Sequence, residues 1–361
     1  YNFVDDDSSL DLNDTAPLLI PSRYEDYYED VKIKDDSVFN HEMAEELSNF
    51  LEIATIDNLC ESEMKLLSIL VKISADINKI FDNEHSMDIC SLQYFYAAKL
   101  NQYFIEQENS ENSITSPPIL CGFHYLCAFH SHSKNELINN LNILSSTSFN
   151  WSNGCLHGLG WWIHNSELKT QILETIAKCQ YQLNQEPLDS ALFYFLLNKK
   201  SVISILYKSK KDSKMSTYFQ QDFNEEDNRL SALKNAYHLL TVHRYMHAIV
   251  FFLLVEQFWE AIQICVSNLK DLQLGFLIAS FCSKNSDMSV KFIKTYLIGE
   301  AEGVQIYGDV FLRSIGFWVL GRYVESLTTL VDKFSSSIVS NLSEKQSPNI
   351  VYSVLTKFHQ L

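Results

Sequence analysis

The chain has 361 residues, of which 46% are hydrophobic and 20% charged, and its formal net charge is -17. This composition supports a large buried core and excludes global disorder. The acidic excess argues against polyanionic partners, so neither nucleic acid nor an anionic membrane surface is expected as a ligand. Protein partners, basic ones among them, are favoured.

Helices are favoured by the scarcity of turn residues. Only 10 Gly and 6 Pro occur, whereas sheets with many tight turns use both residues heavily. The longest apolar run, Ala248–Val255, is far shorter than the roughly 20 residues that a membrane span needs, so no direct membrane insertion is expected. The chain starts at Tyr1 without a basic, then apolar, signal sequence, and we expect it to be part of a longer protein. Eight scattered cysteines are interpreted as reduced, buried and cytoplasmic.

The N-terminal third divides into three predicted segments. Residues 1–40 are predicted to be an acidic, flexible lead-in, with eleven Asp or Glu against three Lys or Arg up to Asp36. Residues 41–106 are predicted to form N-terminal helices, because apolar residues recur there at helical intervals, as in Met64, Leu67, Ile69, Leu70, Ile73 and Ile77. Residues 107–118, a polar stretch ending in two prolines, are predicted to be a linker.

The remaining chain is predicted to be a helical domain over residues 119–334, a loop over 335–348 and a C-terminal helix over 349–361. Its most regular part is residues 224–284, where Asn224 is the expected N-cap of a first helix. A later helix carries an apolar stripe of Phe258, Ala261, Ile262, Cys265, Val266 and Leu269. Helices of about a dozen residues with very short links must fold back on one another. The predicted fold is therefore all-α: stacked antiparallel helix pairs in an α-solenoid-like array, without exact repeats.

The run CGFHYLCAFHSH contains five residues of the two types that most often bind zinc, Cys and His: Cys121, His124, Cys127, His130 and His132. Zinc sites usually hold two ligand pairs separated by a loop. Here successive Cys or His residues are three, three, three and two positions apart. On a helix a side chain three positions further along points about 60° short of a full turn from the previous one. The side chains would spread around the cylinder instead of converging. We interpret the run as one face of a packed helix.

Two other motifs have the same kind of ordinary explanation. His243 and His247 are four apart and are predicted to share a helix face, but Arg244 stands where a metalloprotease carries its Glu. Gly158 and Gly160 lack the third glycine of a dinucleotide site and are expected to permit close helix contact. No phosphate-binding loop or esterase motif occurs. No catalytic, cofactor-binding or metal-binding residue is therefore assigned, no cofactor is expected, and the chain is not expected to be an enzyme.

The helical segments themselves resemble a known family. The stretch Asn228–Ala279, with its ALKNAY core and DLQL end, resembles the large subunit of the RAVE complex and the rabconnectin (DMX-like) proteins. Further blocks follow in the family's order, and together they cover roughly residues 120 to 331: AFHSHSKNELINNL, GLGWWIHN, IAKCQY, PLDSALFYFLLNKKSVISILY and FLRSIGFWVLGRYVESLTTLV. His247 stands where the family tends to have an aromatic residue, and the family's N-terminal propellers are not in this chain.

This resemblance implies a non-catalytic scaffold that promotes assembly of the vacuolar-type proton ATPase from its soluble and membrane sectors. The implied partners are soluble-sector subunits of that pump and other RAVE-type subunits. The implied location is the cytoplasm, with peripheral recruitment to vacuolar or endosomal membranes. Two alternatives stay open from the residues: a vesicle-coat or tethering α-solenoid, and a zinc-dependent enzyme built on Cys121–His132.

Overall fold

The computed structural model describes residues 41–53, 56, 59–81, 87–108, 120–144, 149–163, 166–282, 287–300 and 308–331. Every regular element within these ranges is a helix, which confirms the predicted all-α fold class. None of these helices combines the length and the apolar character that a membrane crossing requires. The predicted acidic lead-in 1–40, most of the predicted linker, the predicted loop 335–348 and the predicted C-terminal helix 349–361 lie outside the described residues.

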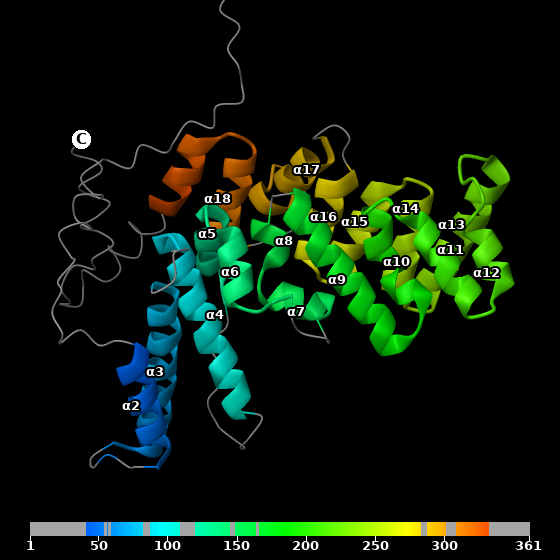
Figure 1. The fold of residues 1–361 in the computed structure, drawn as a ribbon. Helices are drawn as coiled ribbons and strands as arrows, with labels where there is room; N and C mark the ends of the chain where they lie inside the picture. Colours follow the sequence, from blue (N-terminus) through cyan, green and yellow to red (C-terminus); the bar gives the residue numbers. More distant parts are fainter. Residues whose placement is uncertain are drawn as a thin grey trace, which may run out of the picture.

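Three helices form an N-terminal arm that projects from the rest of the molecule (Figure 1). They are α2 (His41–Ile53), α3 (Glu61–Phe81) and α4 (Ile89–Glu108), and α4 extends two residues into the predicted linker. α2 and α3 pack as a hairpin, and α4 connects the hairpin to the body by packing against α5 and α6. The predicted periodicity of α3 is confirmed at its centre, where Ile69 and Ile73 are buried.

The body consists of two rows of helices. The outward row contains α5 (Gly122–His130), α6 (Lys134–Asn140), α7 (Trp151–Leu156), α8 (Leu159–Trp162), α9 (Ser166–Asn184), α10 (Pro187–Leu196), α11 (Lys200–Ser209) and α12 (Ser213–Tyr218). The return row contains α13 (Glu226–Thr241), α14 (Tyr245–Leu254), α15 (Phe258–Ser267), α16 (Leu272–Cys282), α17 (Asp287–Phe292), the π-helix η1 (Ile293–Ile298), α18 (Val310–Val319) and a last helix over residues 323–331.

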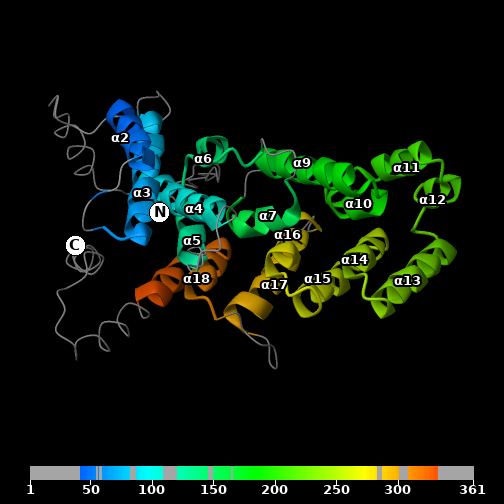
Figure 2. The ribbon, with the colours of Figure 1, turned by 90° about the horizontal axis from the view of Figure 1, so that it is seen from below.

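The chain doubles back on itself, so the two rows lie side by side (Figure 2). Helices α11, α12 and α13 form the end where the direction reverses, and α5 and α18 lie together at the opposite end. The rows are in contact through α10 with α14, α8 with α16, and α5 with α18. Polar links also cross between the rows; in one of them the indole N–H of Trp151 donates to the Asp271 carboxylate at 2.6 Å. Contacts between segments this distant in sequence hold the array as a closed double row.

One backbone turn recurs five times in the described parts of the body. At each turn a single residue has positive φ, between 57° and 72°, and the next N–H donates to the carbonyl five residues back at 2.8–3.0 Å. This is the Schellman closure of a helix end. The five turn residues are Asn198, Lys211, His243, Glu256 and Gly321. The same turn therefore joins consecutive helices in both rows.

The turns also share a buried seam between the helices they join. Each turn is flanked by two buried residues, one seven positions before the turn residue and one five positions after it. All ten are 0–6% exposed. In chain order the pairs are Ala191 with Ile203, Ser204 with Ser216, Ala236 with Ala248, Ile249 with Ala261, and Ser314 with Ser326. In the two serine pairs each hydroxyl donates to the other residue's carbonyl, at 2.9–3.1 Å. Each of the five pairs contains at least one small side chain, Ala or Ser, and the paired serines leave no buried hydroxyl unsatisfied.

Within the return row the predicted stripe is confirmed and one predicted cap is wrong. Ala261, Ile262 and Cys265 are completely buried along α15. The N-cap of α13, however, is Glu225, one residue later than predicted. Asn224 instead donates its hydrogen bonds locally: its backbone N–H and its side-chain amide both donate to the Asp222 carboxylate at 2.9 Å. A short-range turn thus displaced the expected cap.

Candidate interaction surfaces

The Cys/His run is divided between α5 and the residues that flank it. Cys121 is the N-cap of α5, and its backbone N–H donates to Nδ1 of His124 at 3.1 Å. That ring therefore caps the helix start in the manner of an N3 side chain. Cys127 is buried, and its thiol donates to Oε1 of Gln93 at 3.2 Å. Each of these side chains has a structural partner.

The two later histidines of the run point to different surroundings. The His130 ring meets Trp318 of α18 edge-on, with centroids 4.6 Å apart at 88°. Burial, together with the nearby charges of Lys134 and His132, lowers the pKa of His130 to about 4, so the ring is neutral at physiological pH. His132 is exposed. Among the described residues, no three His, Cys, Asp or Glu side chains gather closely enough to hold a metal ion.

The seven cysteines whose surroundings are described are all free thiols. Cys127, Cys179 and Cys265 are buried, as the sequence predicts, but Cys60 and Cys121 are exposed. Both exposed cysteines lie immediately before a helix, where the side chain faces away from the core. The expectation that all the cysteines are buried is therefore wrong at these two positions.

His243 and His247 do not share a helix face, because α14 begins at Tyr245. His243 is the positive-φ residue of the preceding turn, and its Nδ1 lies 2.6 Å from the Tyr245 hydroxyl. His247 lies on α14 and bonds through Nε2 to Oδ1 of Asp189 on α10, also at 2.6 Å. It thereby joins the two rows. The prediction of one shared helix face is wrong, since a left-handed turn separates the two rings.

The glycines of GLGWW permit close packing, as predicted. Gly158 has a φ of +63°, and a Cβ there would lie 2.3 Å from the Tyr125 ring. A Cβ on Gly160 would lie 3.0 Å from the Cβ of Gln273 in α16. The glycines bring α8 against α5 and α16, where Trp161 stacks on Phe276 with centroids 5.5 Å apart. This segment is part of the joint between rows.

Asp88 is a structural residue that the sequence reasoning missed. Its carboxylate accepts hydrogen bonds from the backbone N–H groups of Ser91 at 2.8 Å, His132 at 2.7 Å and Ser133 at 3.2 Å. Burial alone would raise the pKa of Asp88, but these hydrogen bonds outweigh it and lower the pKa. Asp88 therefore caps α4 and ties the arm to the loop after α5. The available signal was an Asp directly before an apolar helix.

A cavity of about 620 Å³ lies between the rows near the end where the chain reverses. Its walls include Phe195 of the outward row and Leu254 of the return row. Lys200 reaches into it, donating from Nζ to the Gln221 carbonyl at 2.8 Å and lying over the Phe223 ring at 4.3 Å. Burial lowers the pKa of Lys200, an effect that Asp222 partly opposes. The Lys200 amine is thus held by hydrogen bonding and ring contact within its own chain.

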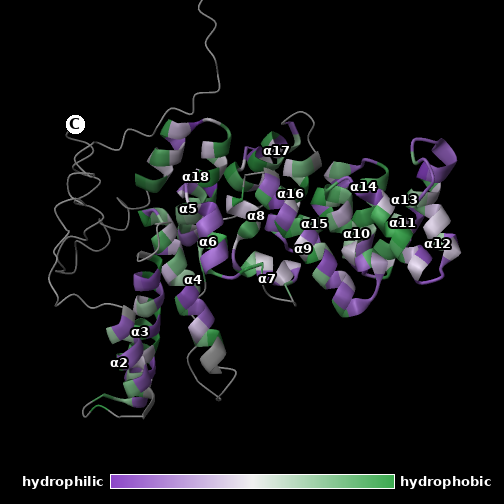
Figure 3. Cartoon of the chain, in the orientation of Figure 1, coloured by the Kyte–Doolittle hydropathy of each residue, from purple (hydrophilic) through white to green (hydrophobic). Residues whose placement is uncertain are grey.

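Two surfaces expose apolar side chains in a regular pattern. The first is on the arm, where Met43 and Phe50 of α2 are 46% and 58% exposed; hydrophobic and hydrophilic residues are mixed along this region (Figure 3). The second is on the last helix, where Val324 and Leu327 are 75% and 56% exposed. Isolated exposed apolar residues are common, but a stripe at helical spacing is typical of a binding surface. Both surfaces are suited to holding another helix.

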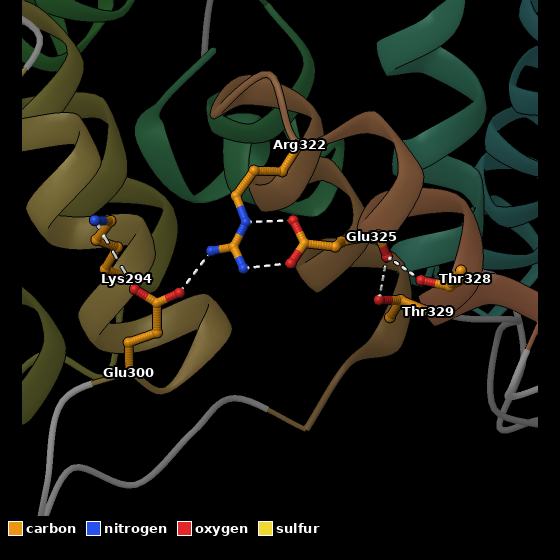
Figure 4. Close-up of polar contacts among 6 residues, drawn as sticks. All are labelled: Lys294, Glu300, Arg322, Glu325, Thr328 and Thr329. Carbon is orange, nitrogen blue, oxygen red and sulfur yellow. Dashed lines mark hydrogen bonds and ion pairs between the residues drawn. The ribbon is translucent and has the colours of Figure 1, made fainter.

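An ion-pair network fixes the last helix in place (Figure 4). Arg322 forms a two-pronged bond with the Glu325 carboxylate and a third bond with Glu300 at 2.6 Å, just after η1. Lys294 of η1 lies 3.9 Å from the same Glu300. These carboxylates raise the pKa of Arg322, and Arg322 in turn lowers the pKa of Glu325. Because the network is solvent-exposed, it orients the helix more than it stabilises the fold.

The sequence is similar to those of several known proteins. DmX-like protein 1 of Mus musculus is 32% identical over 311 residues, which cover 81% of this chain and 10% of that protein. The human DmX-like protein 1 is 30% identical over 312 residues, again 10% of its length. The regulator of V-ATPase in vacuolar membrane protein 1 of Schizosaccharomyces pombe is 25% identical over 339 residues, covering 92% of this chain and 25% of the relative.

The chain thus spans a tenth to a quarter of the length of these relatives. The model of one family, described as RAVE protein 1 C terminal, matches residues 6–358. That range contains the arm, both rows and the recurring turns. Since the match extends over nearly the whole sequence, the chain belongs to the RAVE protein 1 C-terminal family.

Proposed function

We propose that this chain is a helical scaffold that promotes assembly of the vacuolar-type proton ATPase by bringing its soluble sector to its membrane sector. The observation that supports this most directly is the family match over residues 6–358, together with a fission-yeast relative named as a regulator of V-ATPase in the vacuolar membrane and aligned over 92% of the chain. Organelle acidification would then depend on the chain.

The architecture is physically suited to this role. A double row held by contacts between distant segments is stiff, and stiffness lowers the entropic cost of holding two partners at a fixed separation. The net charge of -17 favours protein ligands with basic surfaces over lipid or nucleic acid. We propose soluble-sector ATPase subunits and other RAVE-type subunits as the partners. The role requires binding and no catalysis.

We also propose that the protein acts from the cytoplasm and is recruited to the vacuolar or endosomal surface by its partners. The acidic excess would repel an anionic leaflet, so recruitment through protein contacts is favoured over direct lipid binding. For the organisation of the chain, we propose that residues 119–334 form the family-like domain, with residues 41–106 as N-terminal helices attached to it.

The test is a pull-down with the tagged chain from cytosol in which the pump has been dissociated, analysed by mass spectrometry. We expect soluble-sector ATPase subunits to be enriched with the intact chain. They should be lost with Trp162→Ala, which empties the completely buried site of the largest core side chain and should disrupt the body. A circular dichroism melt of the variant verifies that disruption.

A cellular measurement complements the pull-down. In cells lacking the protein, we expect a higher vacuolar pH and a smaller membrane-bound fraction of soluble-sector subunits, both restored by the intact gene. Normal vacuolar pH and normal sector ratios in such cells would overturn the proposal. Recovery of coat or Rab proteins without ATPase subunits would instead support a tethering scaffold, an alternative that the names of the relatives do not favour.

A further inference from the structure

Helix α2 has two apolar faces, and only one of them is used within the arm. Ala44 and Leu51 are buried on the face against α3, at 0% and 8% exposure. Met43, Leu47 and Phe50 follow one another at spacings of four and three, which places them along a second line on the helix. Met43 is 46% and Phe50 58% exposed, with Leu47 half-buried between them. We call these three residues the outer stripe.

The hairpin exposes further apolar side chains besides the outer stripe. Ile56 and Leu59, in the segment between α2 and α3, are 38% and 39% exposed, and Leu66 of α3 is 42% exposed. Apolar side chains at this density on a projecting hairpin cost solubility, because each exposes area that burial would remove from water. The arrangement is explained if another element covers the outer stripe.

The charged residues around the outer stripe indicate which kind of partner could bind there. The thirteen residues of α2 include four Glu and no Lys or Arg. Glu42 and Glu46 are exposed, lie four residues apart and border the stripe on one side; neither forms an ion pair with another described residue. At the start of α3, Lys65 is paired with Glu61 at 3.1 Å, so its charge is already balanced. The local surface is apolar with a negative border.

We propose that the outer stripe of α2 binds an amphipathic helix of a partner protein whose apolar face is flanked by Lys or Arg. Side chains at spacings of three and four form the ridge that a second helix packs against. Basic flanking residues would pair with Glu42 and Glu46 and would steer the approach. A second copy of α2 would bring the same carboxylates together, and like charges at an interface oppose binding.

This inference rests on the proposed function, because the partner would be one of the proteins that the scaffold joins. Its test is nevertheless independent of the pump. Two synthetic helical peptides of about 14 residues, long enough for four turns, carry the same leucine stripe and differ only in having Lys or Glu beside it. Binding of each labelled peptide to the purified chain is measured by fluorescence anisotropy. We expect the Lys peptide to bind about tenfold tighter or more.

The variant Phe50→Asp removes the largest side chain of the stripe and should weaken binding of the Lys peptide by about tenfold or more. The matched control is Ile205→Asp on α11, since Ile205 is exposed to a similar degree, 62%, in the body. It should change the dissociation constant by less than about twofold. Circular dichroism melts of both variants confirm that each remains folded.

The contribution of charge to binding is tested with a double variant and a control double variant. Glu42→Lys with Glu46→Lys should weaken binding of the Lys peptide and reduce its dependence on salt. Asp227→Lys with Glu260→Lys changes the net charge by the same amount in the return row and should have little effect.

Equal binding of both peptides, or equal binding to the Phe50→Asp and Ile205→Asp chains, would overturn the inference. So would concentration-dependent dimerisation in sedimentation that Phe50→Asp abolishes, because a second copy would then cover the stripe. The proposed function would survive any of these results, since its pull-down and acidification measurements do not depend on the peptides.

Discussion

The return row and the arm use helices in two different ways. In α14 every residue from Ala248 to Leu254 is buried, so the helix has neighbours on all sides. In α2 one face is buried while Phe50, on another face, is 58% exposed. A helix enclosed on all sides is fixed in position by packing, whereas a helix enclosed on one side keeps a surface for other molecules. Packing therefore fixes α14 in position, whereas α2 keeps exposed apolar side chains.

The largest expected effect is in the return row. Phe252 of α14 is 1% exposed and meets the Tyr237 ring edge-on with centroids 5.5 Å apart. Phe252→Ala should lower the free energy of unfolding by about 3–5 kcal/mol, because it removes buried area and leaves a cavity. Chemical denaturation followed by circular dichroism measures this change. Phe252→Leu, which refills most of the volume, should cost less than about 1.5 kcal/mol, and an equal loss in both variants would contradict the packing argument.

A smaller effect is expected where the arm joins the body. Asp88→Ala should lower the free energy of unfolding by about 1.5–3 kcal/mol, because backbone N–H groups of Ser91, His132 and Ser133 lose a charged acceptor. The folded pKa of Asp88 lies below its unfolded value of about 3.9. Its stabilisation is therefore complete above that unfolded pKa and is lost as the pH falls through the folded pKa.

Denaturation at several pH values tests this sign. The difference in stability between the intact chain and Asp88→Ala should be constant near neutral pH and should shrink under acid conditions. A difference that grew as the pH fell would mean that the carboxylate is destabilising in the folded state. Such a result would remove Asp88 as the joint between arm and body.

The serine seams allow a finer test within the body. Ser314→Ala should cost about 0.5–1.5 kcal/mol, because the Ser326 carbonyl loses the Ser314 hydroxyl as its donor and the contact between the two hydroxyls is lost. The Ser326 hydroxyl keeps its hydrogen bond to the backbone carbonyl of residue 314. Ser314→Ala combined with Ser326→Ala should cost less than the sum of the single changes, since either single change already breaks the contact between the two hydroxyls. The equivalent seam of Ala236 and Ala248 already uses alanine. Strict additivity in thermal melts would show that the serines act independently.

The smallest effect is expected on the arm. Phe50→Asp should change the free energy of unfolding by no more than about 0.5 kcal/mol, because the side chain is more exposed than buried. The same denaturation experiment used for Phe252 measures it. A loss approaching that of Phe252→Ala would erase the contrast between the two regions and make Phe50 a packing residue.

Local sequence patterns were enough to predict the helices but not the backbone turn that ends them. The stripe of Ala261, Ile262 and Cys265 is visible because burial on one face of a helix repeats every three to four residues. The recurring turn was hidden because Lys211 and Glu256 adopt positive φ, a conformation that such side chains seldom take. Nothing in their identity distinguishes them from helical residues.

The contacts between the two rows could not be predicted from the sequence for a different reason. Trp151 and Asp271 bond at 2.6 Å although 120 residues separate them, and no local periodicity encodes such a pairing. The sequence predicts that His247 lies on a helix, but it does not reveal its partner Asp189 on the other row. The candidate surfaces depend on which helix faces remain uncovered, and this follows only from the complete packing arrangement.

The side-by-side placement of α5 and α18 has a mechanical consequence. Because the chain enters the double row at α5 and leaves it just after α18, tension between the arm and the last helix would pass across this single contact. There the Phe123 and Phe311 rings lie 5.5 Å apart and His130 meets Trp318. The rows themselves would lie outside the path of the load. A scaffold pulled from both ends could thus keep its shape until that one contact slides apart.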